Sequence, residues 1–173
     1  MTVLLVLAFF VILISMDYVV TRQRLARESK ALAAAAIPAV EPAWVAGYQM
    51  PETLYYHRGH TWARPLDADT VLIGVDDFAR RLIGPVSRAT LPKAGSWLRQ
   101  GDRAANLGID GRKADLVAPV EGEVVETNTL LEKDPGLAIA GPYGRGWLFK
   151  VRSSELGRSF ANLLSGSLAH RFV

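Results

Sequence analysis

Short apolar segments, each closed by glycine, proline or aspartate, follow one another along residues 53–152 of this chain. The clearest is DTVLIGVD, where Val71, Ile73 and Val75 fall on one face of an extended strand and Leu72 on the other. Many short strands separated by tight turns are typical of antiparallel β proteins. The pattern therefore predicts a mainly β domain over 53–152, a sandwich or flattened barrel with a few short helices.

One short helix is predicted from its capping signals. In DDFARRLIG, either Asp76 or Asp77 can cap a helix that Gly84 ends. We interpret the two adjacent aspartates as capping groups rather than a catalytic pair, because the positive end of a helix dipole favours carboxylates. The apolar stripe expected on this helix comprises Phe78, Leu82 and Ile83.

An amphipathic helix followed by a tail is expected in residues 153–173. Ser153 or Ser154 can cap this C-terminal helix, and Gly166 can end it. Its leucine and phenylalanine residues recur at helical spacing, which predicts one face packed against the β domain. That face comprises Leu156, Phe160, Leu163 and Leu164.

Residues 1–21 predict a transmembrane helix. The stretch from Thr2 to Val20 is interrupted only by Ser15 and Asp17, and a bilayer span needs about 20 mainly apolar residues. Positive charges follow this stretch rather than precede it, which indicates an uncleaved anchor with residues 3–20 in the bilayer. The positive residues are Arg22, Arg24, Arg27 and Lys30.

The same order of charges predicts the orientation of the chain. The positive-inside rule places the N-terminus outside and the globular domain in the cytoplasm, at a bacterial-type inner (cytoplasmic) membrane. Residues 22–52 are then expected to form a basic juxtamembrane helix and a linker that contains Pro38 and Pro42. The alternative is a signal peptide cleaved within ALAAAAI, which would release the domain outside.

Several classes of site are not expected. The chain has no cysteine, which excludes disulfides, thiolate metal sites and cysteine nucleophiles. Residues 53–152 hold 14 Lys and Arg against 12 Asp and Glu, so no basic surplus points to nucleic acid. His57 and His60 are expected on opposite faces of a strand, so no metal site is predicted. Without a nucleophile or phosphate-loop motif, we predict no catalytic residues and no enzyme activity. The tryptophans expected in the core are Trp62, Trp97 and Trp147.

Five stretches, in chain order, carry a family resemblance: HTW, IGVDDFARRLIGPV, LPKAGSWLRQGD, APVEGEVVETN and GPYGRGWLFKV. Together they resemble the H-protein of the glycine cleavage system, a lipoyl carrier of the biotinyl/lipoyl fold. The resemblance covers about residues 53–165. It implies a flattened β-barrel that carries a lipoyl group on a lysine at the tip of a hairpin and visits partner enzymes.

The lysine position of that family falls on a glycine in this chain. In the family, this lysine follows the glycine of a Gly-Asp or Gly-Glu turn and precedes an Ala-Pro pair at set distances. Counting from Gly101 and from Ala118 leads to Gly111 both times. Asp110 and Gly111 form a strong signal for a two-residue hairpin turn, and Lys113, the nearest lysine, follows on the returning strand.

From the missing lysine we predict a membrane-tethered domain without cofactor or metal, an accessory or scaffolding subunit of an integral membrane protein complex. The alternative is a lipoyl carrier of the glycine cleavage system or a related pathway, with lipoate on Lys113. Besides the bilayer, the partner is expected to be that membrane complex, and nucleic acid is not expected. The predicted contact residues are Asp110, Gly111, Arg112 and Lys113 in the hairpin, and Arg22, Arg24, Arg27 and Lys30 beside the membrane.

Overall fold

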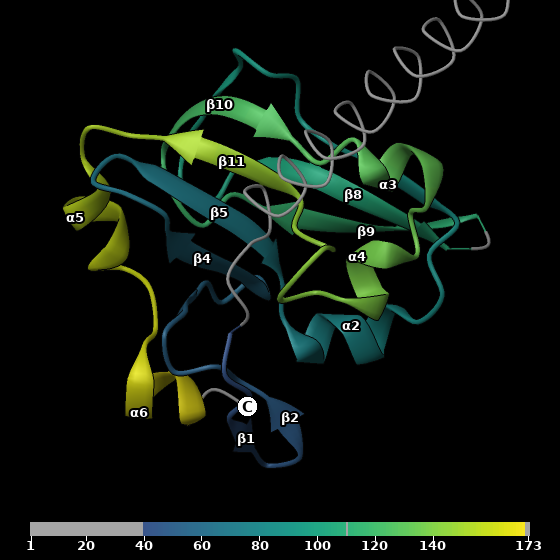
Figure 1. Cartoon of the computed structure of the whole chain (residues 1–173), viewed down its shortest axis with the longest axis horizontal. Coiled ribbons are helices and arrows are strands. Elements are labelled where there is room, and N and C mark those ends of the chain that lie inside the picture. Colours follow the sequence, from purple (N-terminus) through teal and green to yellow (C-terminus); the bar gives the residue numbers. More distant parts are fainter. Residues whose placement is uncertain (1–39, 110, 172–173) are drawn as a thin grey trace, which may run out of the picture. The chain divides into compact units, whose positions relative to one another are not determined.

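The computed structural model describes residues 40–109 and 111–171 (Figure 1). The predicted membrane helix 1–21, the basic residues up to Lys30 and the turn residue Asp110 lie outside these ranges. None of the helices within these ranges has the length and apolar character that a membrane span needs. Residues 39–173 form one compact unit.

A six-stranded antiparallel sheet forms one layer of this unit, in the order β3-β4-β5-β11-β10-β7. Both faces of its central strand β5 are buried, because helices and loops cover the face that points away from the second sheet. The strands are β3 (Tyr55–Tyr56), β4 (Thr61–Pro65), β5 (Thr70–Val75), β7 (Trp97–Leu98), β10 (Gly122–Thr127) and β11 (Phe149–Arg152).

A three-stranded antiparallel sheet packs against the first, in the order β6-β8-β9. Its strands are β6 (Arg88–Thr90), β8 (Arg103–Ile109) and β9 (Arg112–Val117). The core lies between the two sheets: Ile73 and Phe149 from the larger sheet join Leu107 and Leu116 from the smaller one. The predicted mainly β sandwich is confirmed.

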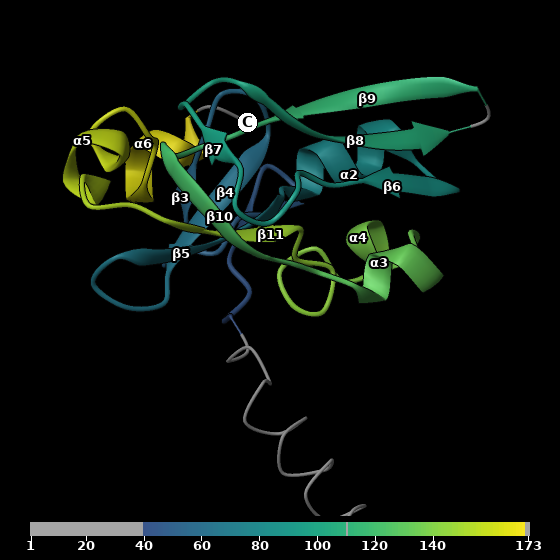
Figure 2. The same ribbon diagram turned by 90° about the horizontal axis from the view of Figure 1, so that it is seen from above.

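In the described part of the chain, five short helices and a small hairpin lie around the sheets (Figures 1 and 2). Helix α2 begins and ends as the sequence predicts, since the side chain of Asp76 accepts a hydrogen bond from the Ala79 amide and Gly84 is the C-cap. The helices are α2 (Asp77–Ile83), α3 (Leu130–Lys133), α4 (Leu137–Ala140), α5 (Leu156–Phe160) and α6 (Gly166–His170), and the hairpin is β1 (Trp44–Val45) with β2 (Tyr48–Gln49).

The prediction of a single C-terminal helix in residues 153–173 is wrong. The chain forms α5 and α6 instead, and Gly166 begins α6 rather than ending a helix. The reason is a tertiary contact: Leu164 and Tyr56 exchange two backbone hydrogen bonds of 2.7 and 2.8 Å, which hold the chain extended between the helices. The leucines of the predicted apolar face are still buried or half-buried.

Two residues assigned to the core are at the surface. Leu82 of α2 is 74 % exposed, because the helix packs through Ala79 instead. Trp97 is 60 % exposed, because β7 is the edge strand of its sheet and turns this side chain outward. Trp62, in contrast, is completely buried, and Trp147 is half-buried beneath the ammonium group of Lys150.

The buried Trp62 requires a glycine on the neighbouring strand. Trp62 and Gly74 are directly opposite in the β4–β5 pair, and the indole ring lies across the glycine. A Cβ atom at position 74 would meet the ring at 2.4 Å. The indole therefore occupies the space that a side chain on β5 would need.

We predict that Gly74→Ala lowers the free energy of unfolding by about 1–3 kcal/mol, because the added methyl group overpacks the core. Urea unfolding followed by tryptophan fluorescence measures this change. Gly157→Ala is the matched control, since a Cβ atom at that position in α5 meets nothing within 4 Å. Equal stability of the two variants would contradict the prediction.

Candidate functional site

The predicted site lies at the turn of the β8–β9 hairpin. Its register runs from Arg103 opposite Val117 to Ile109 opposite Arg112, with one irregularity near Ala105. Two residues, 110 and 111, join the strands, as the sequence predicts, and Gly111 has a φ of +81°. Both views place this end of the hairpin at the edge of the domain, away from α5 and α6 (Figures 1 and 2).

Alternation along β9 separates its core-facing residues from those that face solvent. Leu116 and the opposing residue Ala105 are buried in the core. Lys113 and Asp115 lie on the other face, and both are exposed. The Lys113 amine therefore projects from the outer face of the hairpin, next to the turn.

The outer face has a glycine beside Lys113. Gly108 lies directly opposite Lys113 on β8, and Arg88 lies directly opposite Gly108 on β6. Arg88 and Lys113 are exposed, while Gly108 has no side chain to stand between them. Sequence reasoning missed Arg88, because only the pairing of β6 with β8 brings it to the hairpin.

Gly111, Arg112 and Lys113 thus lie together at the end of one hairpin, as predicted. All three are exposed. Their predicted companions Asp110, Arg22, Arg24, Arg27 and Lys30 lie outside the described residues. The turn itself offers no amine in its described part, since Gly111 has only a hydrogen atom in place of a side chain.

The two aspartates at the start of α2, the N-cap Asp76 and the first helical residue Asp77, are structural. Asp76 caps the helix and contacts His60, with 3.0 Å between its Oδ2 and the ring Nδ1. Asp77 accepts a hydrogen bond of 3.0 Å from the Gln49 amide and forms ion pairs with Arg80 and Arg81. Burial opposes ionisation, but the Gln49 amide and the Arg80 guanidinium outweigh it and hold the pKa of Asp77 below its usual value. This agrees with the interpretation as capping groups.

A stability prediction follows from this lowered pKa. A carboxylate whose pKa is lower in the folded state stabilises the fold at neutral pH and loses this effect as the pH falls through the folded pKa. We expect the free energy of unfolding to fall as the pH drops below the ordinary aspartate value of 3.8.

Asp77→Asn should flatten this acid dependence and cost about 1.5–3 kcal/mol at pH 7, because hydrogen bonds to a charged group are lost. Urea unfolding between pH 7 and pH 3 measures both effects. Asp102→Asn, at an exposed aspartate of a surface turn, serves as the control. An unchanged pH profile in Asp77→Asn would contradict the assignment.

The histidines do not sit as predicted. His57 and His60 lie in the turn between β3 and β4, not on a strand, so the argument from opposite strand faces is wrong. His57 accepts a hydrogen bond of 2.9 Å from the Gly59 amide, and burial, assisted by Arg58, lowers the pKa of His57. Within the described ranges, no cluster of three potential metal ligands was found.

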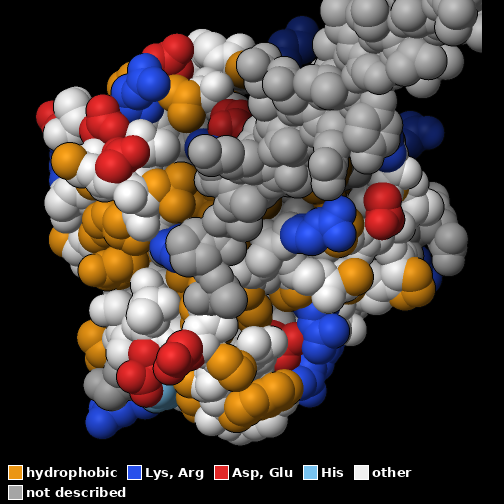
Figure 3. Space-filling view, viewed as in Figure 1, with side chains coloured by type: hydrophobic (Ala, Val, Ile, Leu, Met, Phe, Trp, Pro, Cys, Tyr) orange, Lys and Arg blue, Asp and Glu red, His pale blue; other side chains and the backbone are white. Residues whose placement is uncertain are grey.

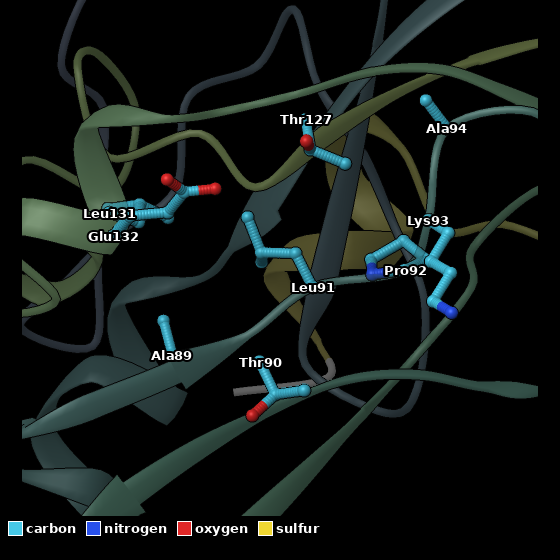
Figure 4. Close-up of a pocket in the computed structure, with 9 residues that line it drawn as sticks. All are labelled: Ala89, Thr90, Leu91, Pro92, Lys93, Ala94, Thr127, Leu131 and Glu132. Carbon is cyan, nitrogen blue, oxygen red and sulfur yellow. The ribbon is translucent and has the colours of Figure 1, made fainter.

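A cavity of about 410 Å³ lies between the end of β6, residues 91–94 and helix α3 (Figure 4). Leu91 stands in the middle of this view, with Glu132 on one side and Lys93 on the other. Lys113 is not among the lining residues. The cavity is therefore separate from the hairpin site.

Comparisons with known proteins agree with the resemblance in the sequence. A family model described as "Glycine cleavage H-protein" matches residues 54–173. The chain is 38 % identical over 108 residues to the glycine cleavage system H protein of Thermus thermophilus, covering 62 % of this chain and 84 % of that protein. It is 33 % identical over 129 residues to the probable H protein of Thermococcus gammatolerans, covering 75 % and 96 %.

A solved structure supports the same conclusion. The crystal structure of a glycine cleavage system H protein from Mycobacterium marinum matches with a TM-score of 0.60 and 28 % identity. The match covers 68 % of this chain and 94 % of that one. The expectation that the chain is not itself an enzyme agrees with these matches.

These matches contradict the expectation of a non-lipoylated scaffolding subunit. The related proteins of Thermus thermophilus, Thermococcus gammatolerans and Rubrobacter xylanophilus are named as H proteins, or a probable H protein, of the glycine cleavage system. The expectation gave more weight to Gly111 at the counted lysine position, and to the membrane anchor, than to Lys113, which a shift of two residues leaves on the same strand face. Lys113 keeps the strand parity of position 111 and presents its amine on the exposed face.

Proposed function

Because the chain belongs to the glycine cleavage H-protein family, we propose that it is a lipoyl carrier whose attachment residue is Lys113. The single observation that carries the choice of residue is the exposed amine on the outer face of the β8–β9 hairpin. This is the alternative interpretation of the sequence. The related proteins are named for the glycine cleavage system, and we propose the same pathway for this chain.

The surroundings of Lys113 fit an acylated lysine. Its neighbour across the strand pair is Gly108, so no side chain blocks the outer face at that position. A rigid pair of strands holds the amine at a fixed place, while the lysine stem keeps its own rotations. When bound, a lipoyl group supplies a dithiolane that carries a chemical group from one enzyme to the next.

The other described lysines are poorer candidates. Lys150 forms an ion pair of 2.6 Å with Glu126 and lies over the ring of Trp147. Lys133 lies in the last turn of α3, between acidic neighbours in the sequence, and Lys93 lines the separate cavity. Lys113 is the one among these four that belongs to the hairpin.

We predict that the full chain, produced together with a lipoate–protein ligase and lipoate, gains the mass of one lipoyl group on Lys113. Peptide mass spectrometry locates the modification. Lys113→Arg should abolish it, because a guanidinium cannot form the amide, and Lys133→Arg should leave it unchanged. Lipoyl mass on another lysine, or on none, would refute the proposal.

A second variant tests the position of the amine. Gly111→Lys combined with Lys113→Arg moves the amine into the turn, at a backbone cost of about 1–2 kcal/mol for a side chain at positive φ. If the ligase modifies this variant and the wild-type chain equally well, a shift of two residues is tolerated. If it modifies only the variant, Lys113 is not the attachment residue.

We further propose that residues 1–21 anchor the carrier in a membrane, with its globular domain in the cytoplasm. The support is the sequence: an apolar stretch followed by four positive residues. The partnership with an integral membrane complex stays a prediction. A carrier held at the membrane can still meet soluble enzymes, since only its domain must reach them.

Trypsin added outside right-side-out membrane vesicles checks the location. We expect the domain to survive until detergent opens the vesicles, and the protein to stay in the membrane fraction after a high-salt wash. A domain that trypsin removes from intact vesicles would contradict the cytoplasmic orientation. A protein recovered in the soluble fraction would contradict the anchor.

A further inference from the structure

Three residues form a row across the outer face of the smaller sheet. Arg88 on β6, Gly108 on β8 and Lys113 on β9 are directly opposite one another in the two strand pairs. Residues opposite one another in antiparallel strands point to the same face. Because neighbouring strands are about 4.8 Å apart, the backbones of Arg88 and Lys113 are separated by about 10 Å.

The glycine in the middle keeps this row open. A Cβ atom at position 108 would lie 3.3 Å from the Cβ atom of Arg88, so a side chain there would crowd the arginine stem. With glycine, the stems of Arg88 and Lys113 border a bare strip of backbone. The strip gives a partner's side chain access to both cations at once.

The positive charges around this strip are not neutralised by the described residues. Among residues 40–109 and 111–171, the ion pairs include neither Arg88, Arg112 nor Lys113. Asp115, the acidic residue on the same face of β9, pairs with Arg103 at 3.3 Å. Asp110 contributes one negative charge in the sequence, which leaves the end of the hairpin with a positive surplus.

We propose that Arg88 and Arg112 form a docking surface for an acidic patch on the enzyme that acylates Lys113. This inference rests on the proposed carrier function and names the chemistry of its partner. Exposed positive charges attract the carboxylates of a partner and speed its association. Arg88 shares the outer face with Lys113, while Arg112 alternates to the other face at the exposed end of the strand. The two arginines would therefore border the amine from both sides of the hairpin end.

Acylation would change the surface that the enzyme recognises. The ligase activates lipoate with ATP as an acyl adenylate; the lysine amine loses a proton and attacks the acyl carbon, the amide bond forms and AMP leaves. The amide is uncharged, so one positive charge is removed while both arginines remain. The enzyme should therefore bind its unmodified substrate more tightly than its product. The charge of Lys113 would thus favour binding before the reaction and release after it.

The test compares acylation rates of the full chain by a purified lipoate–protein ligase with ATP and lipoate. At low ionic strength, we expect the double variant R88E/R112E to raise KM at least about tenfold with little change in kcat, because exposed charges act mainly on association. The effect should shrink at high salt, where screening removes the attraction. R88K/R112K, which keeps the charges, should retain most of the wild-type rate.

R145E/R158E is the matched control, because it changes the net charge equally at two exposed arginines outside the row. Its KM should stay within about twofold of wild type, since its charges lie outside the docking surface. Wild-type rates in R88E/R112E, or an equal loss in the control, would overturn the inference. Urea unfolding of R88E/R112E shows whether that variant is folded, and if it is not, R88Q and R112Q measured singly replace it.

Two further results separate this inference from its alternatives. If wild-type Lys113 is not acylated at all, the proposed function fails, and this inference with it. If Lys113 is acylated and R88E/R112E has no effect, only the docking surface is wrong.

The full chain is also reconstituted in vesicles of neutral lipid with and without anionic phosphatidylglycerol. Protection of Lys113 by anionic lipid, lost in R88E/R112E, would assign the surface to the membrane and overturn the proposal.

Discussion

The antiparallel register of β8 and β9 decides where the chemical groups of this protein lie. Alternation along β9 sends Leu116 into the core and Lys113 to solvent, and a slip of one residue would exchange these two faces. The buried leucine therefore holds the lysine outside. The core between the two sheets and the exposed amine are two consequences of the same pairing.

The rest of the fold keeps this hairpin at the edge of a stable domain. The indole of Trp62 fills the place above Gly74, and Asp77 ties the β1–β2 hairpin to α2 through the Gln49 amide. These contacts lie in the larger sheet and in the elements that cover it. The outer face of β8 and β9 is left to Lys113, which we propose as the attachment residue, with Arg88 beside this face on β6.

Much of the architecture could be predicted, because it depends on local chemistry. The two-residue turn follows from Asp-Gly, and α2 follows from Asp76 and Gly84. The C-terminal region could not be predicted in the same way, since Tyr56, more than 100 residues earlier, holds Leu164 in an extended conformation. Leu82 looked like a core residue because its spacing suits a helix face that the tertiary structure leaves uncovered.

The sequence by itself determined the strands and the two-residue turn, since each depends on residues close together in the chain. It also led to the wrong function, because Gly111 was given more weight than Lys113. Strand parity puts positions 111 and 113 on one face, but the sequence does not show whether that face is exposed. Only the tertiary structure decided that face and brought Arg88 level with Lys113. The physical reason is that strand pairing joins residues through hydrogen bonds between distant segments, and no local pattern records which segments pair.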